Sequence, residues 1–228
     1  MKGLAHLERA NLEEAYLEDT ELRLAHLERA TLQFAHLERA DLWLASLEGV
    51  KLWESSIDND TNLRDAHWGN YILGEETERE FGPAINTYRR LKQWHTNAGM
   101  YDVAGEFFFR EMTVKRKAME WWPKPWNRAF SKLLSILCGY GERPERVGIS
   151  AAVVVLGLAL IYFTIGTLTR NTFLDSLYYS AVSFIALGYG QWAPQPAGWV
   201  KGLGVFEAFI GVFMMALFLV TFTRKMIR

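Results

Sequence analysis

The sequence predicts a multi-domain membrane protein with a repetitive N-terminal domain, a helical connector and a C-terminal domain of two membrane-spanning helices. Three observations predict this organisation. A five-residue repeat begins at Ala5, the periodicity becomes helical from Pro83, and two apolar stretches near the C-terminus are long enough to cross a bilayer.

The two parts of the chain carry opposite excesses of charge. Residues 1–70 contain 7 Lys/Arg and 14 Asp/Glu, whereas the remaining residues contain 18 and 12. An acidic head and a basic, apolar tail indicate different surroundings. The one cysteine, Cys138, excludes an intrachain disulfide and a zinc site built on cysteines. The N-terminus is rich in Glu and Arg and shows no signal peptide, so we expect it to stay on the side where it is synthesised.

Eleven consecutive pentads follow from Ala5, each with Leu or Ile at its centre and a small residue two positions earlier in most of them. Asp60 shifts the frame by one residue before the pattern resumes. A period of five fits neither a helix nor a strand, so the chain must turn a corner every five residues. This region, residues 1–70, resembles the pentapeptide-repeat family. The resemblance implies a right-handed quadrilateral β-helix.

In such a fold four pentads make one coil, so residues twenty apart stack at about 4.8 Å. The central leucines are expected to point inward, and the small residues to fill the corners. The expected inward residues of the first coils are Leu7, Leu12, Leu17, Leu22 and Leu27, and the expected corner residues are Ala5, Ala10 and Ala15.

The outward positions of the coil form columns. His6 is expected to stack with His26, beside a column of glutamates, whereas His36 lies half a coil away. A two-histidine metal site is one interpretation, and a solvated face is the favoured one. Leu24 and Leu44 form an apolar column next to Trp43, which is expected to meet either the following helices or another subunit.

Residues 71–122 are predicted to be a helical connector. The pattern predicts helices over 84–97 and 101–121, broken at Gly99, with Pro83 as a first helical position. We expect this helical pair to cap the open end of the coil. Three consecutive aromatic residues of the second helix are interpreted as core: Phe107, Phe108 and Phe109.

Residues 123–146 are predicted to form an amphipathic helix along the membrane surface. Tryptophans of the type found at interfaces precede or begin it, and apolar residues recur at spacings of three to four with Arg128 and Lys132 between them. The apolar residues are Phe130, Leu133, Leu134 and Leu137. The Gly-Tyr-Gly that begins at Gly139 is followed by charged residues and is not interpreted as a pore sequence.

Two membrane spans are predicted, over residues 147–167 and 202–223. Basic residues cluster before the first and after the second, which by the positive-inside rule predicts two cytoplasmic termini and an outward-facing segment 168–200. The basic residues are Arg128, Lys132, Arg143, Arg146, Arg224, Lys225 and Arg228.

The segment between the spans begins with Thr172 and Asp175, which resemble a capping box, and continues as a predicted short helix over 172–185 that ends in Leu-Gly-Tyr-Gly. The order of span, helix, Gly-Tyr-Gly, proline-containing return and second span resembles the potassium-channel pore, here residues 147–228. The alternative is an ordinary outward loop that happens to contain Gly-Tyr-Gly.

The resemblance implies an ion-binding selectivity filter over 186–190, in which backbone carbonyls replace the hydration shell of K⁺. The implied filter residues are Ala186, Leu187, Gly188, Tyr189 and Gly190. It also implies a gating hinge at Gly211 and cavity-lining residues at Val212, Met215 and Leu219, in four subunits around one axis.

Three residues depart from the family pattern. Ala186 stands in place of threonine, Leu187 in place of valine, and Gln191 in place of aspartate, while Val182 stands where some members have a glutamate partner for that aspartate. Glu207 is the one ionisable residue within a span and is a candidate for filter support, together with Gln191. The alternative for Glu207 is a place in the wet outer mouth of the pore.

The sequence thus predicts a homotetrameric, potassium-selective cation channel of the plasma or inner membrane, with K⁺ as permeant ion, no cofactor and no enzymatic activity. A non-selective cation channel is the first alternative. The second is a membrane-anchored scaffold or DNA-mimic binding protein, because some pentapeptide-repeat proteins resemble acidic nucleic acid. We expect no nucleic-acid partner, and the repeat domain is the expected docking surface for a cytoplasmic partner.

Overall fold

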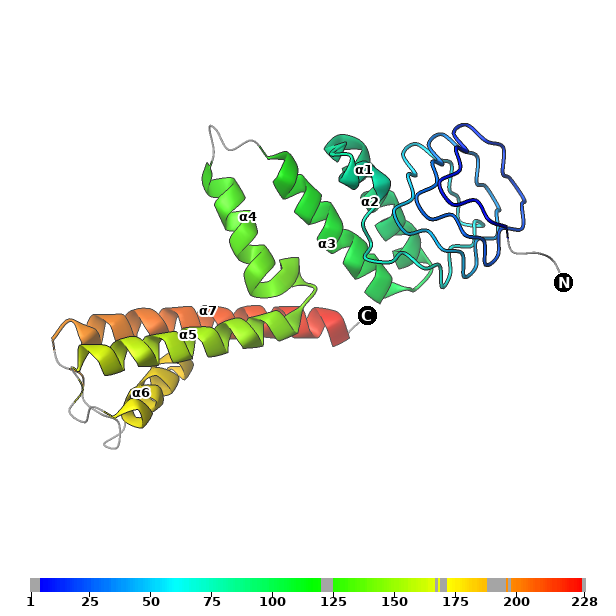
Figure 1. Ribbon diagram of the computed structural model, residues 1–228. Helices are drawn as coiled ribbons and strands as arrows, with labels where there is room; N and C mark the ends of the chain where they lie inside the picture. Colours follow the sequence, from blue (N-terminus) through cyan, green and yellow to red (C-terminus); the bar gives the residue numbers. More distant parts are fainter. Residues whose placement is uncertain are drawn as a thin grey trace. The chain divides into compact units, whose positions relative to one another are not determined.

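The computed structural model describes residues 5–119, 125–166, 168, 172–187, 196 and 198–226 (Figure 1). The chain divides into two compact units, residues 1–132 and residues 133–228. The first contains the repeats and three helices, and the second contains the two long apolar helices with a short helix between them.

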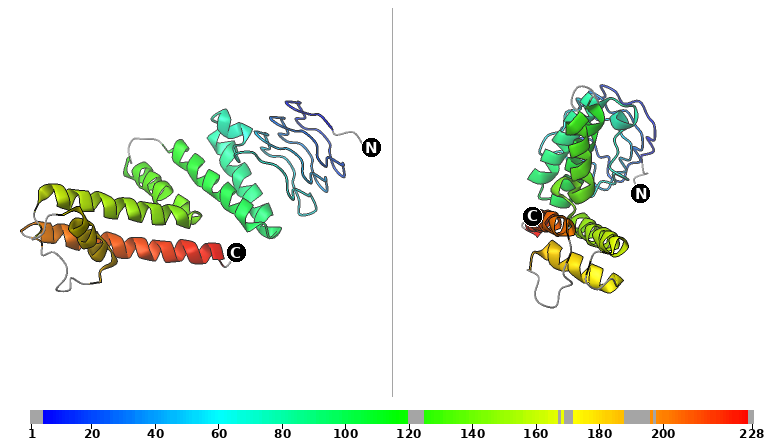
Figure 2. Two further views of the ribbon diagram at one scale, coloured as in Figure 1. Left: turned by 60° about the horizontal axis from the view of Figure 1, so that its bottom comes forward. Right: turned by 90° about the vertical axis from the view of Figure 1, so that its left-hand side faces the viewer.

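Residues twenty apart pair across neighbouring turns of the repeat region (Figure 2). Parallel bridges join His6 to His26 and Asn11 to Thr31, and the same spacing continues along the coil. The amide of Leu7 donates to the carbonyl of His26 at 2.8 Å, and the amide of His26 donates to that of Ala5 at 2.9 Å. Within the described repeats the bridges are isolated pairs rather than continuous strands, because a corner interrupts every pentad.

The corners share a backbone conformation that could not be predicted from the residue types found there. The fifth residue of each of the first ten pentads has a positive φ, as in Arg9 (57°) and Leu24 (59°). Only one of these ten positions is a glycine, Gly49. An amide three residues after each central leucine closes the corner, as where Ala10 donates to the carbonyl of Leu7 at 3.1 Å.

Stacked leucines fill the inside of the coil, as the sequence predicted. Leu27, Leu32 and Leu37 are completely buried, and the small residues Ala25 and Ala30 are buried between them. The first three central leucines are only partly buried and pack against this core. These are Leu7, Leu12 and Leu17.

The predicted frame shift at Asp60 is confirmed, since Asp41 pairs with Asn62, one residue further on than elsewhere. The buried Thr61 holds the enlarged corner together. Its hydroxyl donates to the carbonyl of Leu37 at 2.8 Å, and its amide donates to the carboxylate of Asp58 at 2.7 Å. The carboxylate of Asp58 also accepts a hydrogen bond from the amide of Arg39 at 3.2 Å, where the regular ladder uses a backbone carbonyl, as in the bond from Arg29 to Glu48.

Three helices cover the last coil: α1 (Gly74–Thr77), α2 (Phe81–Asn97) and α3 (Tyr101–Ala118). Helix α1 was not predicted, and α2 begins at Phe81, so that Pro83 is its third residue rather than its first. Of the three phenylalanines assigned to the core, Phe107 is buried, whereas Phe108 and Phe109 are partly exposed. Tyr88 and Phe107 belong to the same apolar cluster as the leucines of the coil, as expected for a cap.

Glu75 of α1 caps the backbone ladder of the coil. Its Oε1 accepts a hydrogen bond from the amide of Leu52 at 2.7 Å, where a further coil would offer a carbonyl. Burial raises the pKa of Glu75, and the amide of Leu52 opposes that rise. The neighbouring Glu76 accepts from the hydroxyl of Tyr88 and the ammonium of Lys117, each at 2.6 Å.

His95 lies in the apolar interior between α2 and α3. It is completely buried, with aromatic rings of Trp94 and Phe107 about it at centroid distances of 4.8 and 5.0 Å. Its Nδ1 donates to the carbonyl of Leu91 at 2.8 Å, whereas its Nε2 has no hydrogen-bond partner among the residues that the structure describes. Burial lowers the pKa of His95 to about 4, because a buried imidazolium would lose its hydration.

This environment predicts an acid-sensitive first unit. Between the ordinary pKa of 6.5 and the folded value of about 4, the unfolded chain binds a proton that the folded chain excludes. Above pH 6.5 His95 therefore does not change the free energy of unfolding. As the pH falls from 6.5 to 4, the uptake of a proton by the unfolded chain lowers that free energy by roughly 3 kcal/mol. His95→Phe, which fits the aromatic surroundings, should abolish this part of the pH dependence. Thermal unfolding of the full chain in detergent, followed by circular dichroism from pH 7 to 4, measures it.

The exposed His67, replaced by Phe in the same way, is the matched control and should leave the pH profile of the wild type unchanged. An identical acid sensitivity in wild type and His95→Phe would show that the buried carboxylates alone cause it.

The second unit is helical: the C-terminal part of α4 (Pro125–Cys138), η1 (Gly139–Gly141), α5 (Pro144–Ile165), α6 (Phe173–Ile185) and α7 (Val200–Met226). Helices α5 and α7 are long and apolar enough to span a membrane. Both begin before their predicted first residues. Helix α6 packs against both long helices, which lie side by side (Figures 1 and 2).

Helix α4 is amphipathic, but its exposed apolar face differs from the predicted one. Trp126, Phe130, Leu133 and Ile136 are exposed. Leu134 and Leu137, predicted for the same face, instead pack against the apolar cluster around Cys138. The two sets are separated because a helix turns by about 100° per residue.

Candidate functional site

The N-terminus of α6 has the predicted cap. The hydroxyl of Thr172 accepts a hydrogen bond from the amide of Asp175 at 3.2 Å and donates to its carboxylate at 2.7 Å. This arrangement satisfies an amide that the first helical turn leaves unpaired and places an acidic group at the positive end of the helix. The start of the short helix could therefore be predicted from two residues.

The residues of the predicted filter follow the C-terminus of α6 directly in the sequence. Ala186 follows the helix in the left-handed conformation (φ 54°), and its amide donates to the carbonyl of Ser183 at 3.0 Å. This conformation is uncommon for a residue with a Cβ, and it turns the chain sharply out of the helix. Leu187 is exposed. Gly188, Tyr189, Gly190 and Gln191 lie outside the described residues, so their filter roles stay predictions.

Gly211 of α7 lies directly against the backbone of α6 at Phe184. A Cβ built on Gly211 would be 1.8 Å from the carbonyl oxygen of Phe184 and 2.6 Å from its carbonyl carbon. Phe184 belongs to the last turn of α6, two residues before Ala186. The predicted role of Gly211 as a hinge stays a prediction, but the contact gives an independent reason for glycine at this position.

Glu207 lies one turn before Gly211 on α7 and is completely buried. The hydroxyl of Tyr162 on α5 donates to its Oε2 at 2.8 Å, and the hydroxyl of Ser180 on α6 is hydrogen-bonded to its Oε1. One carboxyl group thus joins the three helices. The side chain is completely buried within this unit, and its role as filter support stays a prediction.

The residues predicted to line the pore cavity lie on the C-terminal half of α7. Met215 and Leu219 line an apolar cavity of about 440 Å³ together with residues of α5 and Phe184. Val212 is exposed and does not border that cavity. The role of these three residues as the lining of a central cavity between subunits stays a prediction.

Comparison with known proteins gave two family matches. Residues 138–228 match the family described as ion channel, and residues 5–43 match pentapeptide repeats in eight copies. The chain joins pentapeptide repeats to an ion-channel domain. No curated protein and no solved structure matches it. Neither family is a family of enzymes, and the channel domain with its two apolar helices indicates a membrane protein.

The bounds of both matched regions differ from the predicted ones. The repeat match ends at Trp43, whereas bridges between coils continue to His67. The channel match begins at Cys138, before the predicted first span, and so includes η1 and the turn into α5.

That turn contacts the C-terminal end of α7 in the channel domain. Arg224 Nη2 lies 3.0 Å from Oε1 of Glu142, whose side chain is only 9% exposed. The sequence had placed Arg224 among the basic residues that follow the second span but gave no role to Glu142. Their pairing is decided by the fold, since 82 residues separate them in the chain.

Sequence reasoning also missed Tyr162 and Ser180 as partners of Glu207. A signal for the serine was present, because Ser176, Ser180 and Ser183 recur at helical spacing along α6. All three are buried, which marks the face of α6 that meets the other helices. No comparable pattern pointed to Tyr162.

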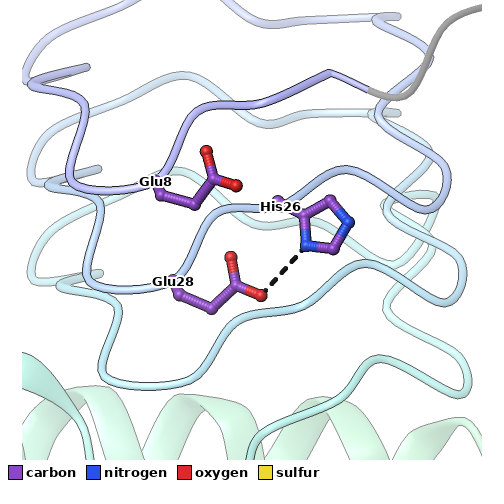
Figure 3. Close-up of side chains that lie close together, drawn as sticks. All are labelled: Glu8, His26 and Glu28. Atoms are coloured by element: carbon purple, nitrogen blue, oxygen red, sulfur yellow. Dashed lines mark hydrogen bonds and ion pairs between the residues drawn. The ribbon is translucent and has the colours of Figure 1, made fainter.

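The repeat region carries the histidine–glutamate columns that the sequence predicted. The rings of His6 and His26 stack at a centroid distance of 5.1 Å. Ligand-type atoms of Glu8, His26 and Glu28 lie within 4.8 Å of one another (Figure 3). His26 Nδ1 is 3.1 Å from Oε1 of Glu28, and His6 Nδ1 is 3.0 Å from Oε1 of Glu8. Each imidazole thus has a carboxylate partner, which explains the cluster without a metal ion.

The same arrangement recurs half a coil away in Glu18, His36 and Glu38. Its recurrence reflects the repeated pentad, in which a glutamate follows a histidine by two residues. The predicted apolar column is present as well: Leu24 and Leu44 are exposed, with Trp43 beside them under the guanidinium of Arg23 at 4.6 Å.

Proposed function

We propose that this chain is one subunit of a homotetrameric, potassium-selective channel. Residues 186–190 supply one quarter of the filter, and the four subunits surround a single axis. The observation that carries the proposal is the end of α6: a helix held between two membrane-spanning helices turns through left-handed Ala186 directly into Leu-Gly-Tyr-Gly. Carbonyl rings of this kind are the means by which proteins replace the hydration shell of K⁺.

Both termini of this channel are cytoplasmic, and α4 lies along the inner membrane surface of a plasma or bacterial inner membrane. Two observations support this orientation. Trp126 and Phe130 on α4 are exposed, and basic residues cluster before the first span and after the second, which favours the same side of the membrane for both clusters. The repeat region forms the right-handed quadrilateral β-helix of the pentapeptide family and offers its outer faces to a cytoplasmic partner. Regular pairing at a spacing of twenty residues supports that fold.

The substitution at Ala186 bears on selectivity. Its carbonyl can still bind an ion, but the hydroxyl that threonine supplies in the family is missing. Selectivity therefore rests on the backbone carbonyls alone at this position. The missing hydroxyl at this position is the reason why a non-selective channel is the alternative, and measured ion selectivity distinguishes the two.

The purified full chain, reconstituted in a planar bilayer with K⁺ on one side and Na⁺ on the other, should carry current that reverses close to the potassium equilibrium potential. Gly190→Ala should abolish conduction, because glycine reaches strained backbone angles without a Cβ penalty. Gly157→Ala is the control, since a Cβ at Gly157 in α5 would meet nothing within 4 Å. A reversal potential near zero would identify a non-selective channel, and a tetramer without current would refute the proposal.

A further inference from the structure

The hydrogen bonds around Glu207 can be tested by counting protons. The hydroxyl of Ser180 is within hydrogen-bond distance of two acceptors, the carbonyl oxygen of Val155 at 2.9 Å and Oε1 of Glu207. A serine hydroxyl has one proton to donate. The carbonyl of Val155 has none, so if Ser180 donates to it, the contact with Glu207 needs a proton from Glu207.

The other oxygen of Glu207 is already satisfied. Tyr162 donates its hydroxyl proton to Oε2 at 2.8 Å. Among the described residues, the hydrogen-bond partners of Glu207 are thus two hydroxyl groups. Its side chain is completely buried, although α7 is otherwise largely apolar. An ionised carboxylate in this position would be a buried charge with only neutral partners, which is costly inside a membrane.

We infer that Glu207 is a neutral carboxylic acid that positions α6 between the two membrane-spanning helices. It donates to Ser180, Ser180 donates to the carbonyl of Val155 on α5, and Tyr162 donates to Glu207. Every donor in this series of hydrogen bonds then has an acceptor. The hydrogen bonds fix the rotation of α6 about its axis, and with it the direction in which Ala186 leaves the helix. This role rests on the proposed channel function, because it acts on the filter through α6.

The inference makes glutamine the conservative replacement. The amide of Glu207→Gln can donate to Ser180 through nitrogen and accept from Tyr162 through oxygen, so the variant should keep the selectivity of the wild type for K⁺ over Na⁺. Glu207→Leu and Ser180→Ala remove a bond of the chain and should each reduce that selectivity about tenfold, as expected for loss of a buried hydrogen bond. Ser176→Ala is the matched control, since the buried hydroxyl of Ser176 lies one turn earlier on α6 and has no hydrogen-bond partner within the described part of the chain.

Selectivity is measured from reversal potentials, and tetramer content by size-exclusion chromatography, so that a change in the filter is separated from failed assembly. An infrared difference spectrum of wild type minus Glu207→Gln should contain the C=O stretch of a protonated carboxylic acid at neutral pH. Absence of that band, or a Glu207→Gln channel as impaired as Glu207→Leu, would overturn the inference.

The infrared band also separates this inference from the proposed function. If the wild-type tetramer carried no current, the channel proposal would fail, and the band alone would still decide whether Glu207 is neutral. If the wild type were potassium-selective and Ser180→Ala were indistinguishable from Ser176→Ala, the positioning role would be refuted while the channel proposal remained.

Discussion

Replacing Gly211 by alanine is expected to eliminate potassium-selective current. The new Cβ would lie 1.8 Å from the carbonyl oxygen of Phe184 and 2.6 Å from its carbonyl carbon, which is less than any contact between real atoms allows. The atoms in the way belong to the backbone of Phe184, so a change of side-chain rotamer cannot relieve the clash. Alanine is otherwise favoured over glycine inside a helix by about 1 kcal/mol, and here the clash reverses that preference. Current in a planar bilayer and tetramer content in detergent measure the effect.

The matched control is Gly202→Ala on the same helix, where a Cβ would meet nothing within 4 Å. This variant should conduct as the wild type does. The comparison also separates two roles of Gly211. A residue that acts only as a hinge would leave selectivity and assembly intact in Gly211→Ala and change only how often the channel opens. Unaltered, fully selective current in Gly211→Ala would contradict the close contact itself.

Replacing Leu27 by lysine is expected to unfold the repeat region. Leu27 is completely buried among the stacked leucines of the coil. Loss of the buried side chain alone costs about 3 kcal/mol, and an ammonium group without a partner adds a desolvation cost. The loss is a large part of the stability of a domain of this size. Circular dichroism and limited proteolysis of the full chain should report loss of the coil, while the channel domain still assembles.

Leu24→Lys is the control for this prediction. Leu24 lies three residues earlier in the same coil, but its side chain is 47% exposed at a corner. Lysine there should change the unfolding temperature very little. Equal effects of the two substitutions would mean that the inward and outward positions of the pentad are wrongly assigned.

The sequence by itself determined the features that depend on short-range periodicity. The central leucines, the frame shift at Asp60, the two apolar helices and the capped start at Thr172 could all be predicted, because each depends on residues within one coil or one helical turn. Helix bounds were less well predicted, as in α2, which begins two residues before Pro83. The residues Gly188, Tyr189 and Gly190 stay predictions, since they lie outside the described part of the chain.

The backbone corners show why periodicity was not sufficient even in the repeats. A positive φ usually indicates glycine or asparagine, yet arginine, glutamate, aspartate and leucine adopt it at these corners. The ladder of bonds between coils imposes this conformation, and a local propensity cannot reveal it. In the same way, the carboxylate of Glu75 ends the ladder only because α1 brings it to the amide of Leu52.

The tertiary structure alone decided the arrangement behind the proposed filter. Tyr162, Ser180 and Glu207 belong to three different helices, and the first and the last are 45 positions apart in the sequence. The sequence marked Glu207 as unusual because a charge in an apolar span is costly, but the hydroxyl groups that offset this cost are contributed by distant parts of the chain. Likewise, Gly211 could be expected to bend α7, whereas its contact with Phe184 follows only from the packing of α7 against α6.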